Sequence, residues 1–154
     1  MLSIALSMLF LPLLSAAVTL LFLRKNGSLA SLLSVSTAGG ILVLALVLIF
    51  SDNPVPLAWD TTWFAMGGWE LRFGFLIDAP AKLLLFIVAF VGFLIHIFSL
   101  GYMADDPARP RYFGGLSIFM FSMLGITLAD NLVMIFVFWE LVGFSSYLLI
   151  AHYF

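Results

Sequence analysis

The feature that most constrains this chain is a series of apolar runs, each about as long as a bilayer is thick. The first run extends from Leu2 to about Leu23. A helix needs about 20 consecutive, mostly apolar residues to cross a membrane. Of the 154 residues, 64% are apolar and 9% are charged, against about 45–50% and about 25% in soluble domains. The sequence therefore predicts a small helical membrane protein.

Charged and helix-breaking segments divide the chain into five predicted spans. Arg24-Lys25-Asn26-Gly27 closes the first span and Asp52-Asn53-Pro54 closes the second. The segment 105–111 separates the third span from the fourth, and only Asp130-Asn131 separates the fourth from the fifth. The predicted spans are 2–23, 29–50, 79–103, 112–129 and 131–154, in a single membrane domain covering 1–154. The first run is interpreted as a permanent helix because no Lys or Arg precedes it, unlike a signal peptide.

The segment 55–77 is not predicted to be a helix. Pro54 and Pro56 disfavour one, and from residue 69 to 75 apolar and other residues alternate in the period of a half-buried strand. Residues 62–66 could pair with that strand across Gly67-Gly68. Because lipid does not tolerate open sheet edges, the hairpin is expected outside the hydrocarbon. The predicted fold is an all-α integral membrane protein with five transmembrane helices and an outward-facing β-hairpin between helices 2 and 3.

The basic residues predict the orientation in the membrane. Five spans place four of them in loops on one side, and these are Arg24, Lys25, Arg109 and Arg111. The hairpin loop on the other side carries Arg72, with Lys82 close to it. By the positive-inside rule the N-terminus and the hairpin are outside and the C-terminus is cytoplasmic or on the matrix side. We expect a multi-pass protein of a bacterial inner membrane.

The composition also excludes several kinds of chemistry. With no cysteine, the chain has no thiolate for a disulfide, an iron–sulfur cluster or a thiolate metal site. A net charge of −2 gives no basic surface for nucleic acid. No glycine-rich phosphate loop, paired haem histidines, zinc motif or nucleophile elbow is present. Transport is the function that remains.

Glu140 is the strongest candidate for a functional residue. If the fifth span begins at Asn131, Glu140 lies ~15 Å along it, in the middle of a hydrocarbon core about 30 Å thick. A carboxylate at that depth costs roughly 2.5–3.5 kcal/mol on insertion scales, so it should face protein or a wet cavity and have a partner. Helical spacing puts Gly143, Phe144, Tyr147 and Ala151 on the same side, and Tyr147 could relay a proton. The alternative is a satisfied interhelical hydrogen bond.

His96 and Asp130 are further candidates, each with a structural alternative. His96 lies in the inner third of the third span, with Ser99 and Tyr102 at helical spacings beyond it. It either carries protons or bonds a neighbouring helix. Asp130 either caps the fifth span with its side chain, which we favour, or guards a proton exit.

Lys82 and His152 are interpreted as mainly structural. Lys82 follows Asp78 by four residues, the favoured order for a helical ion pair, and can reach the outer surface. His152 lies near the end of the fifth span and is expected at the interface.

Three blocks of sequence resemble one family. The segment 130–150 contains Trp-Glu-x-Val-Gly-x-x-Ser-Tyr-Leu-Leu-Ile, beginning at Trp139. Phe73-Gly74-Phe75-Leu76-Ile77-Asp78 precedes the third span, and the segment 91–103 completes it. Together they resemble chain L, or subunit 5, of proton-pumping NADH:quinone oxidoreductase. The similarity covers nearly the whole chain and is clearest from Phe73 onward.

The resemblance implies an antiporter-like subunit of the membrane arm. In that family the glutamate at the position of Glu140 is the essential carboxylate, paired with a lysine on a later helix, and the aspartate at the position of Asp130 is also discussed as functional. The resemblance implies no cofactor in this chain, and NADH, FMN, iron–sulfur clusters and quinone in partner subunits. Expected partners are other antiporter-like subunits of the arm, the remaining helices of the same subunit, and lipids.

Two other interpretations stay open. Subunits of multisubunit cation/proton antiporters and membrane-bound hydrogenases share these motifs, and the chain could also be a structural membrane module that transports nothing. Family members have many more than five helices, so we expect a fragment or a split chain. The family usually has small and hydroxyl residues where this chain has Pro80 and Lys82, which leaves the start of the third span open.

Overall fold

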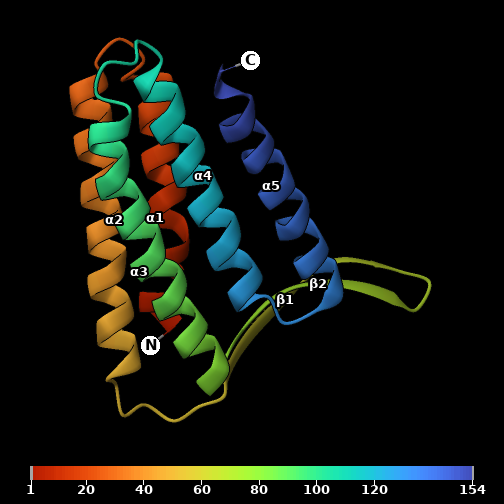
Figure 1. Ribbon diagram of the computed structural model, residues 1–154. Coiled ribbons are helices and arrows are strands. Elements are labelled where there is room, and N and C mark those ends of the chain that lie inside the picture. The colour runs from red at the N-terminus through yellow and green to blue at the C-terminus, as the bar shows by residue number, and fades with distance from the viewer. Residues whose placement is uncertain (1, 154) are drawn as a thin grey trace.

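The computed structural model describes residues 2–153 and has five long helices (Figure 1). They are α1 (Leu2–Leu21), α2 (Gly27–Ile49), α3 (Ala79–Tyr102), α4 (Arg109–Leu128) and α5 (Leu132–Ile150). A 3₁₀ turn, η1 (Ala151–Tyr153), follows α5. Two strands, β1 (Leu57–Met66) and β2 (Trp69–Ile77), form an antiparallel hairpin between α2 and α3. This confirms the predicted fold class of five helices with a hairpin after the second.

All five helices are long enough and apolar enough to cross a membrane. Their lengths run from 19 to 24 residues, which at about 1.5 Å per residue is close to the thickness of the hydrocarbon. The chain is therefore an integral membrane protein.

Side-chain caps explain where two helices begin. The Asn26 side chain accepts a hydrogen bond from the Leu29 amide, and the Asp78 side chain accepts one of 2.8 Å from the Ala81 amide. Pro80 occupies the first turn of α3, where a missing N–H costs nothing. The departure from the family at Pro80 therefore leaves the helix start near Ala79, as predicted.

Several predicted helix boundaries differ from the structure: α1 ends at Leu21 instead of residue 23, and α2 begins at Gly27 instead of residue 29. α4 begins at Arg109 instead of residue 112, because Pro110 is accommodated in its first turn. The fifth helix is regular only to Ile150, and Ala151–Tyr153 tighten into the 3₁₀ turn, a common way to end a helix.

Helices α1 to α4 pack as a bundle, and α5 packs on it mainly through α4 (Figure 1). Met8, Ile41, Leu85 and Leu124 are buried together at its centre. The hydroxyls of Ser34 on α2 and Ser117 on α4 lie 2.9 Å apart in the interior. Small and hydroxyl residues of this kind allow helices to approach closely and bond in lipid.

The hairpin runs from Leu57↔Ile77 at its base to Met66↔Trp69 at its tip. Gly67 and Gly68 form the turn with φ of 58° and 85°, a conformation that glycine adopts without strain. At the base Phe75 and Ile77 are buried, while the tip is exposed. Hydrogen bonds to Glu70 and to Asp60 raise the pKa of exposed Arg72, so it stays charged.

The two ends of the molecule differ in charge. The link from α1 to α2 and the link from α3 to α4 lie at the same end, opposite the hairpin (Figure 1). The basic residues in and beside these links are Arg24, Lys25, Arg109 and Arg111. We call this the basic end.

Candidate functional site

One face of α5 holds it to the bundle. Met134, Phe138 and Ser145 are its buried residues, and their spacing places them along one side of the helix. Phe138 lies against Gly125 of α4, where an added Cβ would overlap the Phe138 ring. A side chain at residue 125 would therefore separate the two helices.

Glu140 lies near the middle of α5 and on the side opposite this packed face. It is exposed, as are Gly143, Phe144 and Tyr147, and Tyr147 is 66% exposed. Within residues 2–153 the Glu140 carboxylate has no hydrogen bond and no ion pair. The small and polar side of α5 is thus directed away from the other four helices.

The positive charges of the chain lie far from Glu140 along the helix axes. There are 6 Lys and Arg residues, and each lies in a link, on the hairpin or in the first turn of a helix. They are Arg24, Lys25, Arg72, Lys82, Arg109 and Arg111. None of these six side chains therefore lies beside Glu140 on α5.

Asp130 does not cap α5, so that part of the prediction was wrong. The cap is Asn131, whose side chain accepts a hydrogen bond of 3.0 Å from the Met134 amide. Asp130 instead packs over Gly74 of β2. Its carboxylate accepts a hydrogen bond from the Asn131 amide group, and its backbone N–H donates to the Gly74 carbonyl. Asp130 is therefore part of the contact between the hairpin and the turn before α5.

The predicted ion pair between Asp78 and Lys82 was also wrong. The Asp78 side chain caps α3, and no ion pair joins it to Lys82 in the described structure. The Lys82 ammonium donates a hydrogen bond of 3.2 Å to the carbonyl of Ser51, which lies just after α2. Lys82 therefore ties the segment after α2 to the start of α3.

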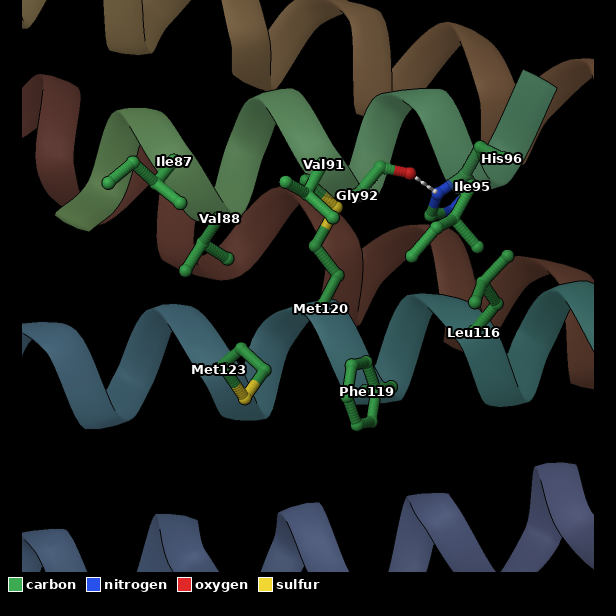
Figure 2. Close-up of a pocket in the computed structure, with 10 residues that line it drawn as sticks. All are labelled: Ile87, Val88, Val91, Gly92, Ile95, His96, Leu116, Phe119, Met120 and Met123. Atoms are coloured by element: carbon green, nitrogen blue, oxygen red, sulfur yellow. Dashed lines mark hydrogen bonds between the residues drawn. The ribbon is translucent and has the colours of Figure 1, made fainter. Parts of the chain in front are cut away.

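His96 is a buried residue of α3. It is 2% exposed, and its Nδ1–H donates to the Gly92 carbonyl of its own helix at 2.7 Å. Figure 2 shows it at one end of an apolar cavity of about 190 Å³ between α3 and α4, which Met120 and Met123 help to line. His96 is thus a buried group in an apolar setting, and the structure does not bring it together with Glu140.

The polar groups near His96 differ from those expected. Ser99 donates to the Ile95 carbonyl and lies 3.0 Å from the Tyr112 hydroxyl on α4. Tyr102 is 57% exposed and stacks on Phe98. The partner of Ser99 is therefore a tyrosine of the neighbouring helix.

The sequence interpretation missed a contact between His152 and Asp106. The His152 Nε2 atom lies 3.0 Å from a carboxylate oxygen of Asp106, and both side chains are largely buried. The His152 ring also packs edge-on against Tyr112. This contact joins the end of α5 to the link between α3 and α4. The sequence shows only that an acidic residue lies in that link and that a histidine follows α5, and nothing in it pairs the two.

Comparisons with known proteins agree with the resemblance. Residues 63–113 match the family described as NADH-ubiquinone oxidoreductase (complex I), chain 5 N-terminus. NADH-quinone oxidoreductase subunit L of Mycobacterium tuberculosis is 47% identical over 93 residues, which cover 60% of this chain and 15% of that protein. NAD(P)H-quinone oxidoreductase chain 5 of a Synechocystis species is 38% identical over 122 residues, covering 78% of this chain and 18% of that protein.

A third relative carries a different electron donor in its name. F(420)H(2) dehydrogenase subunit L of Methanosarcina mazei is 38% identical over 148 residues, covering 94% of this chain and 21% of that protein. The chain thus spans 15% to 21% of the length of these three relatives. Residues 63–113 therefore match the N-terminal part of chain 5 of NADH-ubiquinone oxidoreductase, and the chain is similar to subunit L and chain 5 proteins of NADH-quinone and NAD(P)H-quinone oxidoreductases.

Proposed function

We propose that this chain is part of an antiporter-like, proton-translocating subunit in the membrane arm of an NADH:quinone oxidoreductase. Its role there is proton transfer through Glu140, with Tyr147 on the same face as a relay. NADH, FMN, iron–sulfur clusters and quinone belong to partner subunits in this proposal. The chain contributes helices and a carboxylate, and no redox centre.

The observation that carries the proposal is the position of Glu140. It lies in mid-helix on a face of α5 that no other described helix covers. An ionisable group at that depth is expensive in lipid and marks an ion path when it is retained. Further helices of the same subunit would cover this face and supply the lysine that pairs with Glu140.

The charge of the two ends supports an orientation. With Arg24, Lys25, Arg109 and Arg111 at the basic end, the positive-inside rule puts that end on the cytoplasmic or matrix side. The N-terminus and the hairpin are then outside, and a bacterial inner membrane is the proposed location. The hairpin at the outer surface would be available to neighbouring subunits.

The test is Glu140→Gln in the complete enzyme, with Glu70→Gln as its matched control. The chain has two glutamates, and Glu70 is exposed on the hairpin. We expect Glu140→Gln to assemble but to lower proton pumping and coupled turnover in membrane vesicles, while Glu70→Gln behaves as wild type. Normal pumping by an assembled Glu140→Gln enzyme would contradict the proposal.

Two alternatives give other outcomes. A structural module predicts that Glu140→Gln is silent and that Glu140→Leu, which removes the burial cost, is tolerated or stabilising. A subunit of a cation/proton antiporter or membrane-bound hydrogenase predicts that the chain co-purifies with subunits of those systems. Because one relative is subunit L of an F(420)H(2) dehydrogenase, the subunits that accept electrons from the donor should be identified first among the co-purifying proteins.

A further inference from the structure

We propose that the basic end contains a binding site for the phosphate group of an anionic phospholipid. The site is a cavity of about 420 Å³ between the end of α1 and the start of α4. Thr19 of α1 and Arg24 just after α1 line one side of it. Pro107 just before α4, with Pro110 and Arg111 of α4, lines the other side. This site is separate from Glu140 and does not depend on the function proposed above.

The first observation is the hydroxyl of Thr19. Thr19 is 0% exposed, and its Oγ1 has no hydrogen-bond partner in the described part of the chain. Other helical threonines donate to the carbonyl four residues earlier, Thr37 to Leu33 and Thr127 to Met123. A buried hydroxyl that lines a cavity and lacks a bond is unfavourable unless something occupies that cavity.

The second observation is the charge around the cavity. Arg24 and Arg111 are both exposed at its rim, and the Nε–H of Arg24 donates to the Leu20 carbonyl. Guanidinium groups bind phosphate oxygens through parallel, charge-assisted hydrogen bonds. Two arginines on different elements can therefore hold one phosphate between them.

The third observation is the start of α4, which has 20 residues and no side-chain cap at Ala108. The positive end of the helix dipole favours an anion at this position. The first amides of α4 contribute little, because the Arg109 N–H donates to the Asp106 carbonyl and Pro110 has no N–H. Asp106 lies beside this helix start, where one carboxylate oxygen accepts from the Ala108 amide and the other lies next to His152, and Asp106 does not line the cavity.

The surroundings favour a lipid over a free anion. The cavity lies where the apolar helices end, at the level of membrane headgroups. The last turn of α1 and the residue after it expose Val18, Leu21 and Phe22, at 39%, 65% and 79%. A phospholipid can place its phosphate among the arginines and its acyl chains along these side chains, whereas inorganic phosphate would use only the polar half of the site.

The experiment uses the complete complex in neutral detergent, stripped of lipid and then supplied with a photoactivatable phosphatidylglycerol. We expect labelling of segments 18–24 and 107–111, and little labelling by the phosphatidylcholine analogue. Arg24→Gln, Arg111→Gln and Thr19→Val should each weaken labelling there, the arginine variants by about tenfold, as loss of a charge-assisted hydrogen bond implies.

Lys25→Gln is the matched control, since it removes one charge from the same link without lining the cavity. It should leave labelling unchanged. Equal losses in Lys25→Gln and Arg24→Gln would overturn the proposal, because attraction would then be diffuse. Equal labelling by phosphatidylcholine would overturn it as well. Loss of labelling in excess inorganic phosphate would identify a free-anion site instead of a lipid site.

Discussion

Gly125 keeps α5 against α4 by having no side chain. Gly125→Ala would place a methyl group in steric overlap with the buried ring of Phe138, and overpacking of this kind costs about 1–3 kcal/mol. We expect a lower melting temperature for the purified complete protein in detergent. Gly40→Ala is the control, because open space surrounds a Cβ at that position, and it should melt no lower than wild type. Equal destabilisation by both variants would contradict the packing argument.

The substitution His96→Asn tests whether the buried histidine of α3 carries protons. Its bond goes to its own helix and its cavity is apolar, so we expect His96→Asn to retain pumping in the assembled enzyme. Proton uptake by membrane vesicles is the measurement. Loss of pumping with normal assembly would place His96 in the proton path instead.

The sequence predicts the contacts of a residue well only when its partner is a few positions away in the chain. The period of the helix was enough to put Gly143, Phe144 and Tyr147 on the side of Glu140. The cap of α5 was assigned to Asp130 instead of Asn131, because both residue types cap helices well and are adjacent. The contact between His152 and Asp106 spans 46 residues, and no local pattern reports such a contact.

The first turn of α5 is held by side-chain hydrogen bonds of Asn131. Asn131 caps α5 and also donates to the Arg72 carbonyl of β2 at 3.1 Å. Asn131→Ala removes these two bonds and the one that Asn131 donates to Asp130, and loss of a cap alone costs about 1 kcal/mol. We expect a measurable fall in the melting temperature of the complete protein in detergent.

Asn131→Ser separates the cap from the donated bonds, because serine also caps helices but lacks the amide that donates to Arg72 and Asp130, and it adds no charge beside Asp130. It should melt between wild type and Asn131→Ala. A melting temperature for Asn131→Ala equal to that of wild type would show that none of these bonds matters.

The elements themselves were largely predictable. Apolar runs of bilayer length and the prolines, glycines and charges between them mark five helices, and alternation marks the hairpin. The start of α4 was predicted too late because Pro110 follows a charged link and proline usually ends a helix. In the structure Pro110 lies in the first turn of α4, where proline is well accommodated.

For the chain in its membrane, the orientation is the testable property. The chain has no cysteine, so single cysteines introduced here report one position each. In a background without other accessible cysteines, Lys25→Cys should react with an impermeant maleimide from the cytoplasmic or matrix side, and Trp69→Cys from the outer side. The opposite pattern would reverse the proposed topology.

The packing of the five helices was beyond the sequence. In lipid, apolar side chains face both membrane and protein, so hydrophobicity alone does not separate the two faces of a span. The attachment of α5 through Phe138 and Gly125, and the outward direction of Glu140, required the structure.

The ratio of protons moved to electrons transferred in the reconstituted complete enzyme tests Glu140 most directly. We predict that Glu140→Gln lowers this ratio while electron transfer in the presence of an uncoupler continues, and that Glu140→Asp, which keeps a carboxylate, restores part of it. A ratio equal to that of wild type in an assembled Glu140→Gln enzyme would contradict the account.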